Sequence, residues 1–301
     1  LRGATFLAVL AVLMLALDLG VKGAIAAQAL SLTATSVALF YALRRTAGGL
    51  SLSFPADLVR DEVRYGLKTY AGTIGTFLHQ RVDVLMLNWW TSASAVGLYS
   101  IAAKLAEETW LVSLSAGMVL FPRVSSAEGS AEIKDLTPRV CRSVLWVTAA
   151  MSLILAVPAH WVITTLFSEA FSAATDPFRI LLIGTVSISG TRILQSDLAG
   201  RGRPELGTYI TIAAGVVNIA LNFALIPRFG IVGAAWTTAS TYTLTLVLSL
   251  VAYGRISGNK MSRVVLIRRS DLSTMRQYIV SLALRIKGAL SHDTVSISDH
   301  R

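Results

Sequence analysis

Residues 65–90, YGLKTYAGTIGTFLHQRVDVLMLNWW, decide the fold class of this chain. The stretch is long enough to cross a bilayer as one helix, because a span needs about 20 residues. Yet His79, Arg81 and Asp83 fall near its middle. A charge at the centre of a bilayer costs at least ~2.5–3.5 kcal/mol, so these groups should face a protein partner or a hydrated cavity. The stretch therefore predicts a membrane protein with a functional interior.

The composition agrees with that class. Apolar residues make up 54% of the 301 positions and charged residues 15%, whereas soluble domains average ~25% charged residues. We therefore predict an all-α polytopic membrane protein. The single cysteine, Cys141, allows no internal disulfide, and the four histidines lack metal-ligand spacing. No P-loop, dinucleotide-binding or nucleophile-elbow motif is present, so we expect no cofactor and no enzymatic activity.

Apolar runs of spanning length predict eight transmembrane helices. Proline and glycine residues mark the breaks between them, notably Pro122, Pro138, Pro204, Pro227 and Gly230. Pro158 lies inside the fifth span and is a candidate kink and hinge. The predicted spans are 3–19, 22–43, 65–90, 95–121, 139–166, 177–198, 205–226 and 231–253.

Basic residues predict the orientation. Most of the 27 Lys and Arg residues fall at one set of helix ends, in the 44–64 and 122–138 loops, the 199–204 turn and the C-terminal tail. Cytoplasmic loops of membrane proteins carry an excess of Lys and Arg, so these ends and the C-terminus should lie on the cytoplasmic side of the inner membrane. This skew accounts for the net charge of +10 without a nucleic-acid partner.

Four segments follow from these spans. Residues 1–45 hold two helices of an N-terminal lobe, 46–64 a cytoplasmic linker, and 65–254 a six-helix lobe. Residues 255–301 form a basic tail, in which Leu272, Met275, Ile279, Leu282 and Ile286 recur at helical spacing. The tail is predicted to contain an amphipathic helix on anionic lipid, the alternative being a solvated tail.

An internal repeat relates the two lobes. Residues 15–45 match 225–255 without a gap, including the glycine turns at Gly20 and Gly23 against Gly230 and Gly233. Each copy of the turn lies between the last two helices of its lobe. The repeat therefore predicts two parallel lobes of six helices, with four helices of the first lobe missing before Leu1.

Five segments recur in a familiar order: RVDVLMLNWWTSASAVGLYSIAAKL (81–105), LFPRVS (120–125), LFSEAFSAATDPFRIL (166–181), LAGRGRP (198–204) and NIALNFALIPRFGIVGAAWTTAS (218–240). In this order they resemble the Wzx-type lipid-linked oligosaccharide flippases, the polysaccharide biosynthesis exporters of the MOP superfamily. The superfamily also holds the MATE drug exporters and the lipid II flippases. The resemblance implies a MATE-like two-lobe fold that opens alternately to each side. It also implies transport of an undecaprenyl-diphosphate-linked oligosaccharide to the outer leaflet.

Three intramembrane cations could bind the diphosphate headgroup of this lipid-linked substrate. Arg81, Lys104 and Arg192 lie within predicted spans, and arginine binds phosphate oxygens with a planar fork of donors. The alternative is structural pairing, above all for Lys104, which has Glu107 and Glu108 three and four residues on.

Two asparagines are further candidates. Asn218 and Asn222 could bind sugar hydroxyls or hydrogen-bond between helices.

Carboxylates could couple transport to an ion. Asp83, Glu107 and Glu108 lie inside the spans, and His79 shares a helix face with Asp83. Removal from water favours the neutral form of a carboxylate, so one of them could carry a proton, or bind sodium. The alternative is a satisfied structural network.

Three other functions compete with the flippase. A MATE-type drug exporter should have an acidic, aromatic cavity. A membrane polymerase or ligase should have a large loop with catalytic groups, and the loops here are short. The last alternative is a truncated fragment that does not transport.

Overall fold

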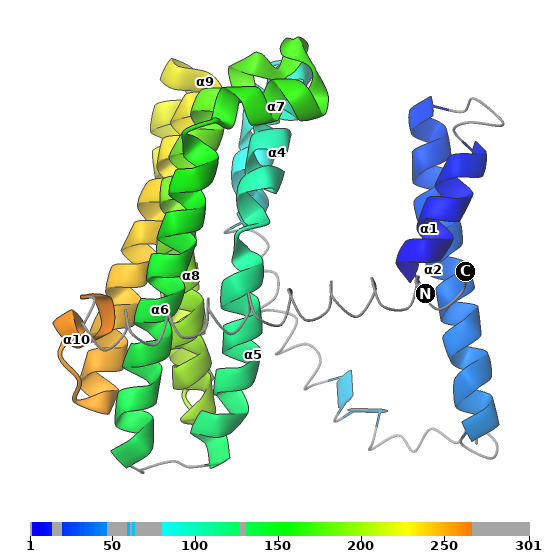
Figure 1. Cartoon of the computed structure of the whole chain (residues 1–301). Coiled ribbons are helices and arrows are strands. Elements are labelled where there is room, and N and C mark those ends of the chain that lie inside the picture. Colours follow the sequence, from blue (N-terminus) through cyan, green and yellow to red (C-terminus); the bar gives the residue numbers. More distant parts are fainter. Residues whose placement is uncertain are drawn as a thin grey trace, which may run out of the picture. The chain divides into compact units, whose positions relative to one another are not determined.

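The computed structural model describes residues 2–13, 20–46, 59–60, 62–63, 80–126 and 131–266, and every regular element in these ranges is helical (Figure 1). The chain divides into two compact units, Leu1–Gly66 and Leu67–Arg301. The predicted all-α class is confirmed. Within these described ranges, four helical stretches are long and apolar enough to cross a membrane: Gly20–Thr46, Lys134–Ala156, Glu169–Gly200 and Pro204–Ser257.

The first unit is a helical hairpin. Helix α1 (Arg2–Ala11) packs against α2 (Gly20–Thr46). The buried residues of α2 are Gly23, Ala27 and Ser31, which recur every four residues along one face. These small side chains allow the two backbones to approach closely, as is usual between membrane helices.

The two copies of the repeat share a backbone conformation. Gly20 and Gly230 both have positive φ, 50° and 55°, a region that glycine enters without steric cost. The same face is buried in both copies, with Gly23, Ala27 and Ser31 corresponding to Gly233, Thr237 and Thr241. Thr33 and Thr243 each donate to the carbonyl four residues back, at 2.9 Å in both cases. These matches support the repeat.

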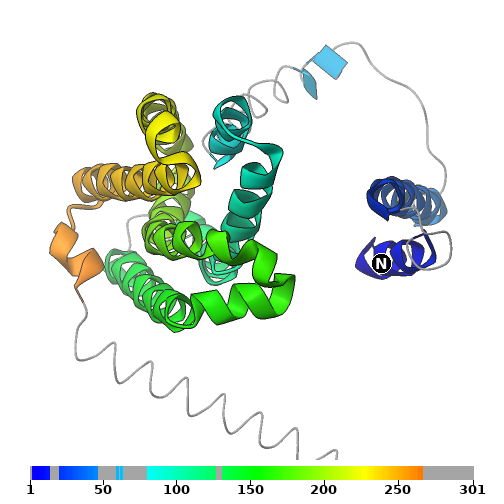
Figure 2. The ribbon, with the colours of Figure 1, turned by 90° about the horizontal axis from the view of Figure 1, so that it is seen from above.

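The second unit is a bundle arranged around α8. In order it contains helix 80–90, α4 (Ala93–Glu107), α5 (Trp110–Ser126), α6 (Ala131–Ala156), α7 (Ala159–Phe167), a 3₁₀ helix η2 (Glu169–Ala174), α8 (Thr175–Gly200), α9 (Pro204–Ser257) and α10 (Met261–Val265). Helix α8 contacts α4, α5, α6 and α9. Figure 2 shows it near the middle of these helices, which explains why most of its residues are buried.

Helix α9 is two helices that meet at Gly230. The φ/ψ angles of Gly230, 55° and −131°, are not helical, and the chain reverses there. Asn218 in the first half donates to Thr241 in the second at 3.1 Å. The predicted break between spans 205–226 and 231–253 is confirmed.

Two other breaks divide predicted spans. The kink expected at Pro158 is confirmed, since α6 ends at Ala156 and α7 begins at Ala159. The break between α4 and α5 was not predicted; it lies at residues 108–109, within the expected span 95–121. There, the backbone and side chain of Thr109 both donate to Ala106 O, a local bond that competes with the helix.

Pro122 and Pro138 do not end helices, contrary to prediction, and neither does Pro227, which lies inside the first half of α9 before its break at Gly230. Pro122 lies inside α5 and Pro138 inside α6. Proline is tolerated within a membrane helix when neighbouring groups satisfy the freed carbonyls. The helices therefore extend past both residues, to Ser126 at the end of α5 and back to Ala131 at the start of α6.

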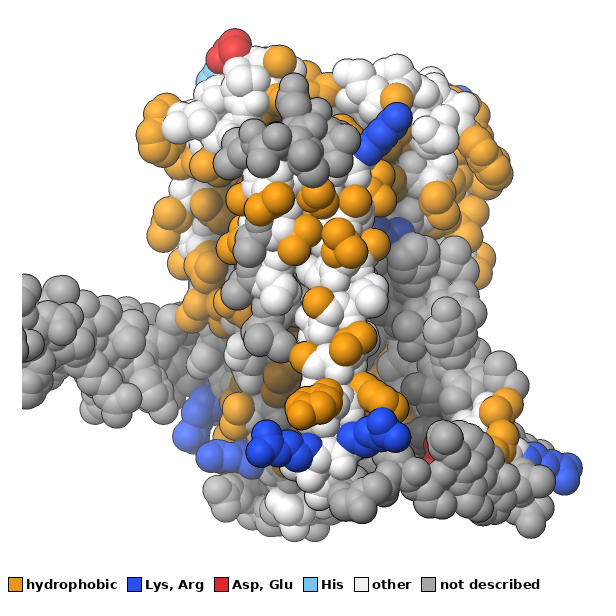
Figure 3. Space-filling view, turned by 90° about the vertical axis from the view of Figure 1, so that its right-hand side faces the viewer, with side chains coloured by type: hydrophobic (Ala, Val, Ile, Leu, Met, Phe, Trp, Pro, Cys, Tyr) orange, Lys and Arg blue, Asp and Glu red, His pale blue; other side chains and the backbone are white. Residues whose placement is uncertain are grey.

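The bundle packs closely at glycines of α8. A Cβ atom added to Gly184 would lie 2.8 Å from the Cα atom of Ala239 in α9, and one added to Gly200 would lie 2.9 Å from Val124 in α5. Many large apolar side chains elsewhere are exposed, among them Leu153, Trp161 and Val216, as expected for surfaces that face lipid. Helix α2 of the first unit likewise exposes Val37, Leu39 and Phe40, and its last turn carries Arg44 and Arg45. Figure 3 shows apolar side chains over the middle of its view and Lys and Arg side chains near the lower end.

Several predictions lie outside the described residues. These are the first part of the span 65–90, most of the linker 46–64, and the amphipathic helix of the tail. His79, a candidate for ion coupling, also lies outside them.

Candidate functional site

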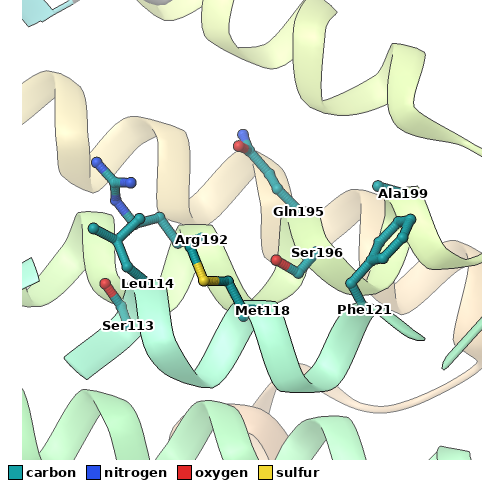
Figure 4. A pocket seen from close by; sticks show the side chains of 9 residues that line it. Ser113, Leu114, Met118, Phe121, Arg192, Gln195, Ser196 and Ala199 are labelled. Carbon is teal, nitrogen blue, oxygen red and sulfur yellow. The ribbon is translucent and has the colours of Figure 1, made fainter. Parts of the chain in front are cut away.

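A pocket of about 570 Å³ lies between α5 and α8, with Arg192 in its wall (Figure 4). The two helices approach closely beside it, because a Cβ atom on Gly117 would lie 2.8 Å from Ser196 Oγ. Its volume lies within the ~300–1,000 Å³ of typical ligand pockets. The lining residues are Ser113, Leu114, Gly117, Met118 and Phe121 from α5, and Arg192, Gln195, Ser196 and Ala199 from α8.

Helical spacing gives this pocket, which we call the Arg192 pocket, one polar and one apolar wall. Arg192, Gln195 and Ser196 are three and four residues apart and therefore share a face of α8. Leu114, Met118 and Phe121 share a face of α5 in the same way. The pocket can therefore bind a ligand that has both charged or hydrogen-bonding groups and an apolar chain.

The Arg192 guanidinium rests on an aromatic ring rather than on a carboxylate. Its Cζ atom lies 4.4 Å from the centroid of Trp110. Its Nε atom is buried and has no hydrogen-bond partner in the part of the chain that the structure describes. A cation over the face of tryptophan is attracted by the ring quadrupole. The terminal NH2 groups of Arg192 have no ion pair among the described residues and can donate to an anionic ligand.

A second, smaller pocket surrounds Asp83. The Asp83 carboxylate accepts hydrogen bonds from the hydroxyl of Tyr99, from Thr238 Oγ1 at 3.1 Å and from the backbone N–H of Val84 at 2.8 Å. The pocket measures about 20 Å³, room for one water molecule or an ion of similar size. Its other lining residues are Gln80, Ala103, Ala106, Glu107, Trp110, Leu181, Thr185 and Tyr242.

Arg81 and Asp83 occupy different environments, although they are two residues apart. The Arg81 side chain is 40% exposed and pairs with Glu107 of α4 at 3.0 Å, whereas Asp83 is buried. Lys104 pairs with Glu108 at 3.0 Å on the exposed side of α4. The structure thus brings Asp83 and Glu107 to one pocket and leaves Arg192 in the other.

Asn218 and Asn222 are fully enclosed between the two halves of α9. Asn222 Nδ2 donates to Asn218 Oδ1 at 2.8 Å, and Asn218 Nδ2 donates to Thr241. Neither residue lines the Arg192 pocket or the Asp83 pocket. Asn222 Oδ1 and Thr237 Oγ1 are buried without a hydrogen-bond partner among the described residues.

Several site residues were missed by the sequence reasoning. Gln195 and Ser196 could have been found, because they follow Arg192 at i+3 and i+4 on the same helix face. The threonine-rich run from Thr237 to Thr245 in an apolar span was also a signal. No comparable signal pointed to Tyr99 or Trp110, whose roles depend on contacts between helices.

Comparison with known proteins assigns the family. The family model described as polysaccharide biosynthesis protein matches residues 1–176, and the model described as lipid II flippase MurJ matches residues 95–287. The chain belongs to the polysaccharide biosynthesis protein family of membrane flippases. The predicted resemblance to MOP-superfamily flippases is confirmed by these matches.

The curated relatives are archaeal membrane proteins. The chain is 27% identical over 197 residues to the probable low-salt glycan biosynthesis flippase Agl15 of Haloferax volcanii, covering 63% of this chain and 41% of that protein. It is 27% identical over 177 residues to the probable flippase AglR of the same organism, covering 57% and 37%. It thus spans about two-fifths of the length of these relatives.

Among solved structures, the chain is similar to a MATE-family multidrug resistance transporter of the MOP superfamily. The outward-facing structure gives a TM-score of 0.49 at 19% identity, covering 67% of this chain and 47% of that one. The inward-facing structure gives 0.47 at 22% identity, with coverages of 66% and 47%.

Proposed function

We propose that this chain takes part in moving a lipid-linked glycan from the inner to the outer leaflet of the cytoplasmic membrane by alternating access. The proposed substrate is an undecaprenyl-diphosphate-linked oligosaccharide. Its diphosphate and sugars must cross hydrocarbon while its lipid chain stays in the bilayer. That task needs a polar, cationic surface inside the membrane, next to an apolar one.

The Arg192 pocket is the observation that carries this proposal. The guanidinium of Arg192 has no carboxylate partner among the described residues, so an anionic ligand would not have to displace an ion pair. Gln195 and Ser196 offer hydrogen bonds to phosphate or sugar, and Met118 and Phe121 offer an apolar wall. This combination suits an amphipathic phosphate ester.

The other predicted substrate residues receive lesser roles. We assign Arg81 and Lys104 to the surface that the headgroup passes, because each is partly exposed but already paired with a glutamate. Asn218 and Asn222 are enclosed and bonded to each other and to Thr241, so we assign them to holding the two halves of α9 together.

The Asp83 pocket is the proposed coupling site, for a proton or sodium. Its carboxylate is buried beside a space for one small species and has no basic side chain bonded to it in the described part. Glu107 lies in the same pocket but pairs with Arg81, and Glu108 pairs with Lys104, so both are weaker candidates. Asp83→Asn should abolish any dependence of transport on an ion gradient; an unchanged dependence would exclude this role.

Arginine and lysine residues at one end of the bundle support a cytoplasmic orientation of that end. They include Arg123 at the end of α5 and Arg203 before α9, and the positive-inside rule then places these ends in the cytoplasm. The test is the variant Glu205→Cys in a Cys141→Ser background, treated with an impermeant maleimide in intact cells. Reaction of this cysteine would reverse the assignment. The basic tail is proposed to bind anionic lipid.

A cation-coupled drug exporter is the alternative. That activity needs an acidic cavity of drug size, ~300 Å³ or more. The pocket that contains Asp83 and Glu107 measures about 20 Å³, while the Arg192 pocket and another pocket of about 390 Å³ beside Arg179 have no acidic residue in their linings. Both features favour the anionic substrate.

Binding of inorganic diphosphate to the purified protein tests the proposal. Arg192→Ala should weaken binding about tenfold or more, because hydrogen bonds to charged groups contribute ~1.5–3 kcal/mol each. Arg192→Lys should retain part of the affinity, since lysine keeps the charge but loses the planar fork. Arg179→Ala is the matched control, because Arg179 lies outside the Arg192 pocket and bonds Ala156 O. Equal binding by wild type and Arg192→Ala would contradict the proposal.

A further inference from the structure

Trp110 stands at the break between α4 and α5, where it is the first residue of α5. Its side chain is only 9% exposed, and its indole Nε1 atom is buried without a hydrogen-bond partner in the described ranges. A tryptophan that is buried usually finds a partner for this N–H group. Its position is therefore not explained by hydrogen bonding, and the contacts of its ring must account for it.

One of these contacts is with Arg192. The guanidinium carbon lies 4.4 Å from the ring centroid, and the Nε atom of Arg192 has no hydrogen-bond partner among the described residues. No carboxylate of the described part lies within ion-pair distance of Arg192. The indole ring is therefore the contact that fixes the charged end of Arg192 at the wall of its pocket.

Another contact faces the Asp83 pocket. Trp110 lines that pocket together with Asp83, Glu107 and Tyr242. The rings of Trp110 and Tyr242 meet edge to face, with centroids 6.3 Å apart. Trp110 thus touches Arg192, which lines the large pocket, and itself lines the small one. It is a side chain that connects the two.

The helix break lies between Trp110 and the end of α4. Glu107 is the last residue of α4 and is tied to Arg81 at 3.0 Å, and Trp110 follows after only two residues that belong to neither helix. A change in the Asp83 pocket that moves the end of α4 would reach Trp110 within three residues. A continuous helix would instead spread such a movement over its length.

We propose that Trp110 is a positioning residue that holds Arg192 toward an anionic headgroup and makes this placement depend on the state of the Asp83 pocket. This rests on the proposed function, in which Arg192 binds the headgroup. It adds a physical connection between the coupling site and the substrate site. A change at Asp83 would alter diphosphate affinity through Trp110, without direct contact between the two ligands.

A spectroscopic test isolates Trp110. In a variant of the full chain with Trp89, Trp90, Trp146, Trp161 and Trp236 replaced by phenylalanine, Trp110 is the sole indole. We expect inorganic diphosphate to shift the fluorescence emission of Trp110, and Arg192→Gln to abolish this shift. Asp83→Asn should change the emission without diphosphate, and it should change the diphosphate concentration that gives half of the shift by about threefold or more. Emission and half-shift concentration that are unchanged by Asp83→Asn would overturn the proposal.

A second measurement applies if the five replacements prevent folding. With the other tryptophans intact, Trp110→Leu should weaken diphosphate binding about tenfold, and Trp110→Phe, which keeps an aromatic face, less than about threefold. Trp161→Leu is the control, because Trp161 is 66% exposed on α7. Equal binding by Trp110→Leu and wild type would overturn the proposal.

The two proposals can fail separately. If the Trp110 emission responds to Asp83→Asn and to diphosphate while no glycan is moved, the positioning role stands and the flippase function fails. If glycan is moved and Trp110→Leu leaves the KM for it unchanged, the flippase function stands and the positioning role fails.

Discussion

Asp197 is a charged side chain with 0% exposure in the last turn of α8. Its two carboxylate oxygens accept hydrogen bonds from Thr137 Oγ1 at 2.5 Å and from Arg201, four residues on, with the shortest distance also 2.5 Å. The bonds join α6, α8 and the turn that follows α8. Breaking a buried ion pair from one side costs ~3–5 kcal/mol, because the remaining charge stays desolvated.

Asp197→Asn should therefore lower the free energy of unfolding by about 3 kcal/mol, since the amide keeps the size of the carboxylate but loses its charge. Thermal unfolding of the purified protein in detergent measures the change. Asp176→Asn is the control, because the Asp176 side chain is 76% exposed, and it should unfold at the wild-type temperature. Equal midpoints for all three proteins would show that the Asp197 pair contributes nothing.

Sequence reasoning identified the intramembrane charges but only some of their partners. The Lys104–Glu108 pair follows from an i,i+4 spacing on one helix and is found at 3.0 Å. Glu107 was expected near Lys104 as well, but it bonds Arg81 of the preceding helix. Trp110 beneath Arg192 had no signal, because the two residues are far apart in sequence and meet only in the folded bundle. Contacts between residues of different helices depend on how the helices pack, and spacing along one helix does not predict that packing.

At the scale of elements, helix breaks were predictable where glycine or proline causes them. Gly230 and Pro158 mark breaks that the structure contains. The break at residues 108–109 has neither residue, and it depends on local bonds of Thr109 to Ala106 O. At Pro122 and Pro138 the sequence predicted breaks that the structure does not contain, because a membrane bundle tolerates proline inside helices.

Close approach of α8 and α9 depends on Gly184. In Gly184→Ala, the new methyl group would lie 2.8 Å from the Cα atom of Ala239, a backbone atom that cannot turn away. Such overpacking costs ~1–3 kcal/mol, so the thermal midpoint should fall clearly below that of wild type. Gly97→Ala on α4 is the matched control, because no atom lies within 4 Å of its added Cβ. A midpoint for Gly184→Ala at or above the control would contradict this packing.

At the scale of the molecule, the fold class was within reach of the sequence. Apolar runs of spanning length predicted a helical membrane protein, and five ordered segments indicated the flippase family to which the chain belongs. The repeat is supported by the shared positive φ of Gly20 and Gly230. The site was only partly predictable: Arg192 and Asp83 were named, but their separate pockets and the contact through Trp110 are properties of the packed bundle.

Transbilayer movement is the measurement that tests the central claim most directly. The full-length protein, reconstituted into vesicles, is given a polyprenyl-diphosphate-linked oligosaccharide, and the fraction that reaches the opposite leaflet is followed with an impermeant sugar-modifying reagent. We predict movement by wild type and by Arg179→Ala, and an initial rate at least about tenfold lower for Arg192→Ala, as expected for loss of a charged hydrogen bond of ~1.5–3 kcal/mol. Movement at the same rate in Arg192→Ala and wild type, or none above protein-free vesicles for wild type, would contradict the account.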